Sequence, residues 1–121
     1  MIKGEIVGNK PLIPITIGWC FGVQDVLALV DTGFTGELKV SPKQAIFLGL
    51  QVTHTEIVTL ADNIKQPFPA SIAVVSLEGI MKVVNVLIAE GEPIVGVGLM
   101  KNYEYILKAN FKLDILVLQK A

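Results

Sequence analysis

The sequence contains no arginine, one cysteine and one histidine, and each shortage excludes a class of function. The 10 basic residues are all lysine and are scattered along the chain, so the bidentate side chain that reads phosphate groups and guanine is missing. The formal net charge of −1 gives no attraction to a polyanion. We therefore expect no nucleic acid as a partner.

A single cysteine, Cys20, excludes an internal disulfide and makes a reducing cytoplasm the expected location. The apolar runs, such as residues 72–75 and 86–89, are far shorter than the roughly 20 residues that a membrane-spanning helix needs. Residues 1–5 lack the long apolar stretch of a signal peptide. The sequence predicts a cytoplasmic protein that does not bind a membrane.

Hydrophobic residues make up 52% of the chain and charged residues 17%. With 121 residues, the chain has the size of a single domain, spanning 1–121, that buries a real core. The apolar excess indicates either a well-filled interior or a surface for a second copy, because obligate dimer contacts resemble a core cut in half. Core or interface positions, and not a cofactor site, are expected for four aromatic residues: Trp19, Phe21, Phe47 and Phe111.

A mainly β structure is predicted, because Val and Ile are abundant and short apolar runs end at Gly, Pro, Asn or Asp. The expected strands are residues 2–8, 12–17, 26–30, 51–60, 64–77, 79–88 and 111–117. Strand 26–30 is apolar throughout, which is typical of burial on both faces. The alternation in 111–117 is typical of a strand with one buried face.

Two short helices are predicted as well. Ser41 can cap the first, Pro42 suits its first position, and Gln44 completes a capping box with Ser41. Gly49 is expected to end this helix, and a second helix is expected at residues 99–103.

The strands 51–60 and 64–77 are expected to form a hairpin with Asp62 and Asn63 at its tip. Both residue types tolerate the positive φ angles of tight turns.

Asp31 is the strongest candidate for chemistry, because it directly follows the apolar strand 26–30 at the boundary of the core. Thr32 supplies a hydroxyl that can brace it, and Gly33 lets another backbone or a ligand come close. One carboxylate is a weak catalyst of amide hydrolysis, whereas two that share a proton provide an acid and a base. Since the chain has one copy of this triplet, such chemistry requires a symmetric dimer.

Residues 28–36, Ala-Leu-Val-Asp-Thr-Gly-Phe-Thr-Gly, resemble the active-site stretch of retropepsin-like aspartic peptidases, particularly their compact bacterial and archaeal relatives. The similarity continues in order along the chain. Residues 42–50 resemble the small helical segment after the catalytic loop, and residues 60–63 resemble the flap tip. Residues 94–100 resemble the apolar-Gly motif before the closing helix.

This resemblance implies a closed, mostly antiparallel, barrel-like β fold that acts as a homodimer, with one catalytic Asp31 from each subunit. Thr32 would join a paired-threonine network beneath the two aspartates. Gly33 would approach the substrate or the partner loop, and Gly96 would pack against the active-site loop. No metal and no cofactor are implied.

The flap is the second part of the implied site. Its tip, made of Ala61, Asp62 and Asn63, would close over an extended peptide or protein substrate and exclude water. The peptide would lie as an added strand that is bound largely through its backbone.

Three positions depart from the pattern of the family. Phe34 stands where a small residue is common, and its ring would narrow the cleft or fill the core. Asn63 replaces a frequent flap glycine, and Gly98 replaces a charged or polar residue that stabilises the dimer in viral members. These departures bear on substrate preference, flap motion, dimer strength and turnover.

Other constellations are weaker. Cys20 and His54 form a conceivable nucleophile and base, but no ordering signature accompanies them. A zinc site is short of ligands, and the Gly-Val-Gly at 96–98 lacks the spacing of a dinucleotide loop. Asp31 also lacks the nearby acidic or basic partners of phosphorylated-aspartate enzymes.

Two functions stay open at this point. One is an active homodimeric aspartic endopeptidase without a metal. The other is a peptidase-like dimerisation or peptide-binding module with negligible turnover, because a fold can host binding without catalysis. A monomer that shares only the fold is a third possibility.

Overall fold

The structure is a computed structural model that describes residues 1–59 and 62–121. These residues form ten strands and two short helices, which confirms the predicted mainly β fold class. In chain order they are β1 (Ile2–Val7), β2 (Lys10–Trp19), β3 (Gly22–Val30), β4 (Leu38–Val40), α1 (Pro42–Leu48), β5 (His54–Thr59), β6 (Lys65–Leu77), β7 (Ile80–Ile88), β8 (Ile94–Val95), α2 (Val97–Asn102), β9 (Tyr105–Asn110) and β10 (Ile115–Lys120).

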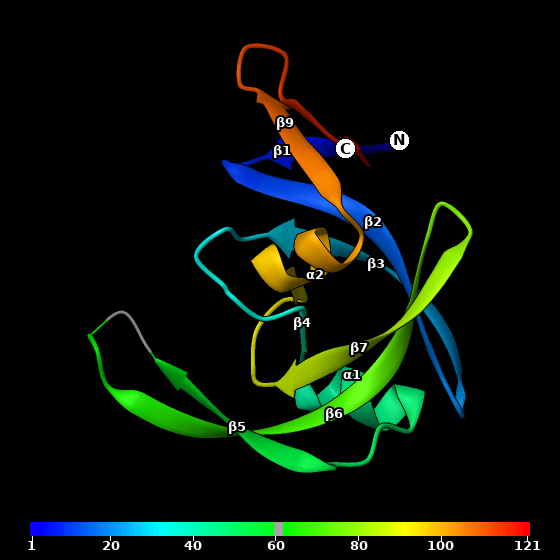
Figure 1. Cartoon of the computed structure of the whole chain (residues 1–121), viewed down its shortest axis with the longest axis vertical. Helices are drawn as coiled ribbons and strands as arrows, with labels where there is room; N and C mark the ends of the chain where they lie inside the picture. Colours follow the sequence, from blue (N-terminus) through cyan, green and yellow to red (C-terminus); the bar gives the residue numbers. More distant parts are fainter. Residues whose placement is uncertain (60–61) are drawn as a thin grey trace.

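The strands form one connected sheet that closes on itself (Figure 1). Their order is β5-β6-β7-β4-β8-β3-β2-β1-β10-β9, and an additional pairing joins β6 to β2. This pairing closes β2, β3, β8, β4, β7 and β6 into a ring. Neighbours run antiparallel except in the pairs β3–β8 and β4–β7, which are parallel. At one end β1, β10 and β9 extend the sheet beyond β2, and at the other end β5 extends it beyond β6.

The core lies inside this ring. Along β2, the side chains of Ile13, Ile15 and Ile17 are buried, while the residues between them are more exposed, as expected for a strand with one face inward. The other strands and both helices add further apolar side chains to the same cluster.

Tyr103, just after α2, is fully buried and joins the two ends of the β6–β7 hairpin turn to the helix. Its hydroxyl lies 2.8 Å from the carbonyl oxygen of Val75 and 2.9 Å from that of Ile80. The hydroxyl donates its one proton to this pair of acceptors. Burial raises the pKa of this hydroxyl. The ring of Tyr105 stacks on that of Tyr103 with centroids 5.5 Å apart, and the ammonium group of Lys82 lies 5.1 Å from the Tyr103 centroid.

The predicted capping box of α1 is confirmed. The Ser41 hydroxyl oxygen accepts a hydrogen bond from the Gln44 N–H at 3.1 Å, and the Gln44 side-chain oxygen accepts one from the Ser41 N–H at 3.0 Å. Gly49 follows the helix in the left-handed conformation, with φ 75°, which ends it as predicted.

The prediction that strand 26–30 is buried on both faces is wrong for this chain. Ala28 and Val30 are buried, but Leu27 is 61% exposed. Strand β3 forms part of the wall of the ring, so alternate side chains point inward to the core and outward.

The predicted strand at 111–117 is confirmed only for residues 115–117, which belong to β10, and its predicted buried face is wrong. Residues 111–114 form the turn between β9 and β10, in which the Asn110 side-chain oxygen accepts hydrogen bonds from the N–H groups of Lys112 and Leu113. Strand β10 begins at Ile115 and buries Leu116 and Leu118, which is the opposite alternation to the predicted one. A local side-chain cap at Asn110 therefore outweighs the hydrophobic alternation.

The core prediction for the aromatic residues holds for one of four. Trp19 packs against the core and is partly buried. The other three, Phe21, Phe47 and Phe111, are at least 59% exposed, so they lie outside the core of this chain. Their assignment to an interface stays a prediction.

Within the described ranges, no helix has the length and apolar character to cross a lipid bilayer.

Replacing Tyr103 by phenylalanine tests the role of its buried hydroxyl. Tyr103→Phe keeps the ring but leaves two carbonyl oxygens without this donor, and we expect the free energy of unfolding to fall by about 1–3 kcal/mol. Urea denaturation followed by circular dichroism measures the change. The matched control is Tyr105→Phe, whose hydroxyl bonds the exposed Glu78 carboxylate, and it should cost below about 0.5 kcal/mol. Equal losses in both variants would contradict this role of Tyr103.

Candidate active site

Asp31 lies where β3 leaves the ring and begins a loop that runs to Glu37. Its N–H donates to the carbonyl oxygen of Val95 at 3.0 Å, which continues the parallel pairing of β3 with β8. The Gly33 N–H donates to the Asp31 Oδ1 atom at 2.8 Å, and the Phe34 N–H donates to the Asp31 carbonyl oxygen at 3.1 Å. These bonds make a tight turn that fixes one carboxylate oxygen and leaves the Asp31 side chain partly exposed.

The loop from Asp31 to Glu37 rests on the segment that opens α2. The N–H groups of Gly96, Val97 and Gly98 donate to the carbonyl oxygens of Glu37, Phe34 and Gly36, at 3.1, 2.9 and 3.0 Å. The structure thus brings the predicted residues 31–33 and Gly96 together. These amides are occupied by the loop, so the Gly-Val-Gly segment offers no phosphate cradle.

Only glycine fits at position 96, because the backbone of the loop lies too close for a side chain. A Cβ atom at this position would lie 2.3 Å from the Gly36 carbonyl oxygen and 2.4 Å from that of Phe34. A Cβ atom at Gly98 would lie 2.9 Å from the same Gly36 oxygen. Gly98, which replaces a polar residue of the family pattern, therefore allows a close approach of two backbones.

The Phe34 ring, singled out as a departure from the pattern, lies over the loop and at the edge of a cleft. Ring atoms would be 2.5 Å from a Cβ atom at Gly36 and 2.6 Å from one at Gly96, so the ring packs on both glycines. Phe34 is partly buried and lines the cleft described below.

Glu37 braces the end of the loop, and the sequence analysis missed it. One oxygen of its carboxylate accepts a hydrogen bond from the Asn85 N–H at 3.0 Å, and the other accepts one from the Asn102 side-chain amide at 2.7 Å. The ammonium group of Lys82 in turn donates to the Asn102 carbonyl oxygen at 2.7 Å. The partners of Glu37 lie 48 and 65 residues away in the chain, so no local pattern could indicate them.

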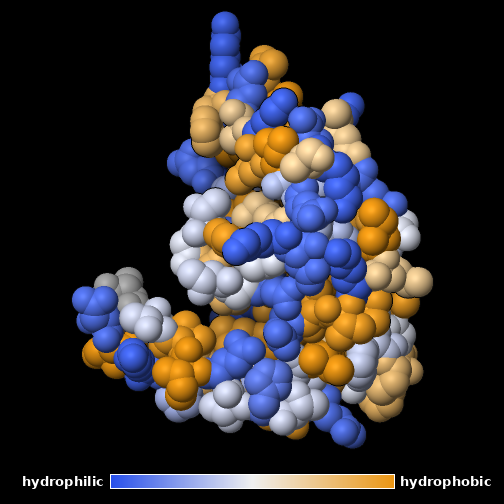
Figure 2. All heavy atoms as spheres, viewed as in Figure 1, coloured by the Kyte–Doolittle hydropathy of each residue, from blue (hydrophilic) through white to orange (hydrophobic). Residues whose placement is uncertain are grey.

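A cleft of about 350 Å³ separates this loop from β5. Residues 33–36 line one side and residues 56–59 the other. In the space-filling view, a hollow opens between the hairpin arm at lower left and the body of the molecule (Figure 2). The arm consists of β5 and the first half of β6, which leave the ring together (Figure 1).

The predicted flap tip is described in part. Asn63 has a φ of 63°, as the prediction of a positive angle at this turn requires, and the Asp62 Oδ1 atom accepts a hydrogen bond from the Ile64 N–H at 3.1 Å. Ala61 lies outside the described residues. Thr32 is exposed on the loop.

The alternative pair of Cys20 and His54 is occupied elsewhere. The Cys20 sulfur lies 3.6 Å from the Gly49 carbonyl oxygen, and the His54 ring nitrogens contact Thr53 and Glu56 at 2.7 and 3.1 Å. In the part of the chain that the structure describes, no group of three or more His, Cys, Asp or Glu side chains is placed to hold a metal ion.

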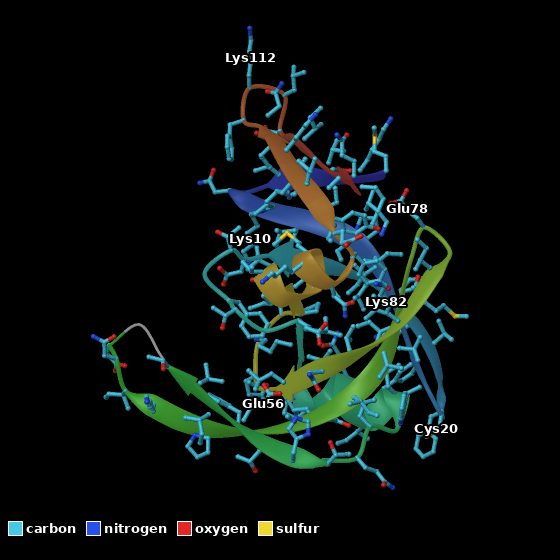
Figure 3. All side chains as sticks on the ribbon, in the orientation of Figure 1. Lys10, Cys20, Glu56, Glu78, Lys82 and Lys112 are labelled. Atoms are coloured by element: carbon cyan, nitrogen blue, oxygen red, sulfur yellow. The ribbon has the colours of Figure 1, made fainter. Side chains whose placement is uncertain are left out.

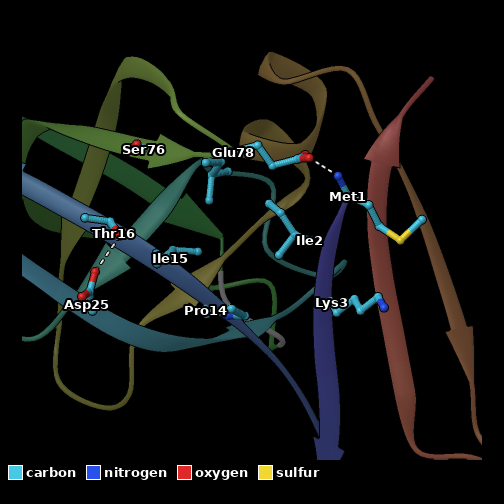
Figure 4. A pocket seen from close by; sticks show the side chains of 10 residues that line it. Met1, Ile2, Lys3, Pro14, Ile15, Thr16, Asp25, Ser76 and Glu78 are labelled. Atoms are coloured by element: carbon cyan, nitrogen blue, oxygen red, sulfur yellow. Dashed lines mark hydrogen bonds and ion pairs between the residues drawn. The ribbon is translucent and has the colours of Figure 1, made fainter.

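A second pocket, also of about 350 Å³, lies between β1, β2 and the β6–β7 turn (Figure 4). Its acidic groups are already paired: Asp25 accepts a hydrogen bond from the Thr16 hydroxyl at 2.6 Å, and Glu78 binds the terminal ammonium group of Met1. The two pockets have about the same volume, but only the cleft adjoins the Asp-Thr-Gly loop. The cleft beside Asp31 holds the candidate site.

Comparison with known proteins agrees with this placement at the level of the fold. No protein-family description and no curated protein matches the chain. Among solved structures, it is similar to the crystal structure of a retropepsin-like aspartic protease from Rickettsia conorii, with a TM-score of 0.71 and 17% sequence identity, over 99% of this chain and 89% of that chain. The chain therefore has the retropepsin-like fold, as its resemblance to that family implies; at this identity the likeness establishes the fold alone.

The contact at Gly96 gives a test of how the loop is held. We expect Gly96→Ala to lower the free energy of unfolding by about 1–3 kcal/mol, because the added methyl group collides with two backbone carbonyl groups that cannot move freely. Gly18→Ala is the matched control, since its Cβ atom would lie no closer than 3.6 Å to any neighbour. Thermal and urea unfolding measure both. Gly96→Ala as stable as the parent would show that the loop is not packed in this way.

Proposed function

We propose that the chain is an aspartic endopeptidase that acts as a homodimer, with Asp31 of each copy forming the catalytic pair. The observation that carries the proposal is the position of Asp31: a partly exposed carboxylate, one oxygen of which is fixed by the Gly33 N–H, at the edge of a cleft in a retropepsin-like fold. Gly33 supports this carboxylate, Gly96 holds the loop that carries it, and Thr32 is proposed to join its copy in the partner beneath the two aspartates.

The dimer follows from the number of carboxylates. Each chain supplies one Asp-Thr-Gly triplet, and two carboxylates in close contact cannot both ionise cheaply, so the pair retains one proton. The ionised member takes a proton from a water molecule, whose oxygen attacks the peptide carbonyl carbon. The protonated member gives its proton to the carbonyl oxygen. Transfer of a proton to the amide nitrogen then releases the amine as the C–N bond breaks.

The substrate is proposed to be an extended peptide. Strand β5 pairs with β6 on one side and is at the end of the strand order, so among the described residues its other edge has no strand partner. An extended peptide in the cleft can use this edge for backbone hydrogen bonds, as in other cases of strand addition. The flap tip at 61–63 is proposed to close over it.

Exposed apolar side chains support association of two copies at this side of the molecule. Val97 stands next to the loop, and Ile57 and Ile64 stand on the hairpin arm, each exposed by 38% or more. Exposed apolar side chains are frequent at interfaces between proteins. We also propose a cytoplasmic location, which a free, exposed Cys20 supports.

Asp31→Asn tests the catalytic role. The asparagine side chain retains an oxygen that can accept from the Gly33 N–H, so we expect the fold and the dimer to persist. Cleavage of a peptide library, read by mass spectrometry, should fall at least about a hundredfold, because the pair can no longer provide acid and base. Asp25→Asn is the control, because it makes the same chemical change at a β3 residue that lines the second pocket.

Two outcomes would count against the enzyme. Unchanged cleavage by Asp31→Asn, with contaminating protease excluded, would remove Asp31 from the mechanism. Binding of extended peptides without any hydrolysis by the parent protein would favour the peptide-binding module.

The dimer has its own test. Sedimentation at micromolar concentration should give the mass of two chains, and activity per chain should fall on dilution, because the site is incomplete in one copy. A monomer whose activity per chain does not change on dilution would contradict the shared site.

A further inference from the structure

Negative charge dominates the cleft. Among the described residues that line it, Glu56 is the charged one, and the remainder are apolar or carry hydroxyl groups or no side chain. Asp31 adjoins the same cleft through Gly33, whose N–H it binds. Both formal charges at this surface are therefore negative.

Three lysines on other segments have positions or partners outside the cleft. Lys65 lies opposite Thr59 in the β5–β6 ladder but does not line the cleft. Lys39 donates to the carbonyl oxygen of Glu90 at 2.8 Å, and Lys10 pairs with Glu92 at 3.3 Å. Among the described residues that line the cleft there is no lysine, so this surface offers its negative charge to a ligand.

Glu56 is placed to receive such a cation. Its side chain is 37% exposed, and its Oε1 atom lies 3.1 Å from the His54 Nε2 atom, whose ring contacts the Thr53 hydroxyl. Within the described ranges, its Oε2 atom has no hydrogen-bond partner. Figure 3 shows Glu56 on the hairpin arm, below the loop that begins at Asp31. The His54 contact orients the carboxylate and leaves one oxygen for a ligand.

The surroundings of Glu56 suit a long side chain with a charged end. Phe34, Ile57 and Val58 line the same cleft and offer apolar surface for methylene groups. Lysine and arginine bury their stems against apolar surface while the charged end reaches a polar partner. An acidic substrate side chain would instead meet two like charges.

We propose that Glu56 is a specificity-determining residue that selects substrates with lysine or arginine in the subsite between β5 and the Phe34 loop. This inference rests on the proposed function, which gives an extended peptide as the substrate. It adds the class of side chain that the cleft prefers. The attraction is electrostatic and partly exposed to solvent, so it should weaken as salt is added.

The test compares peptides that differ only by lysine, glutamine or glutamate, scanned through the positions that flank the cleaved bond. At the responsive position we expect the parent protein to prefer lysine to glutamate in kcat/KM by roughly tenfold. A partly exposed ion pair with lysine and the repulsion of glutamate together account for a ratio of this size. Glu56→Gln should bring the ratio close to one, and Glu56→Lys should invert it. Glu5→Lys makes the same charge change on β1, away from the cleft, and should leave the ratio as in the parent.

A binding assay separates this inference from the proposed function. Fluorescence anisotropy with labelled lysine and glutamate peptides is measured on Asp31→Asn, with and without Glu56→Lys, at low and high salt. The lysine preference should persist in Asp31→Asn and reverse in the double variant. If the parent cleaves nothing, the peptidase proposal falls and binding still decides the role of Glu56. If Glu56→Lys left the lysine-to-glutamate ratio unchanged in both assays, the inference would be overturned.

Discussion

The backbone contact between the Asp31 loop and residues 96–98 is the constraint on which the rest of the site depends. Three N–H groups of this segment bind three carbonyl oxygens of the loop, and no side chain fits between them at Gly96. The parallel pairing of β3 with β8 delivers both segments to the same place. The Asp31 carboxylate, which we propose as catalytic, thus stands directly at the end of a paired strand and on a loop that is held by backbone hydrogen bonds.

The ring of strands also makes the cleft. Strand β6 belongs to the ring through its pairing with β2 and β7, and its first half leaves the ring to pair with β5 alone. The hairpin arm is therefore a continuation of a core strand, which anchors the base of the arm. Glu37 ties the opposite wall of the cleft to β7 and α2, so both walls are fixed to the same body.

Local interactions explain which elements were predictable. The capping box at Ser41, the end of α1 at Gly49 and the positive φ of Asn63 each depend on residues within a few positions, and all three were predicted. One error concerns which face of a strand is buried, and the other concerns where a strand begins. Leu27 is exposed because β3 is a wall of the ring, and residues 111–114 turn because Asn110 caps them. The exposure of Leu27 depends on strands that are distant in sequence, whereas the turn at 111–114 depends on a local side-chain cap that competes with the hydrophobic pattern.

The sequence by itself determined the chemistry that the chain can offer: one carboxylate after a strand, followed by Thr32 and Gly33, with no arginine and too few ligands for zinc. Its resemblance to the retropepsin-like peptidases also implied that Gly96 packs against the active-site loop. Only the tertiary structure decided how close that contact is, which partners hold Glu37, and that Glu56 faces the Asp31 loop across a cleft. The reason is physical: turns and caps form within a few residues, whereas a site is assembled from backbone and charge contacts between segments that meet only when the ring closes.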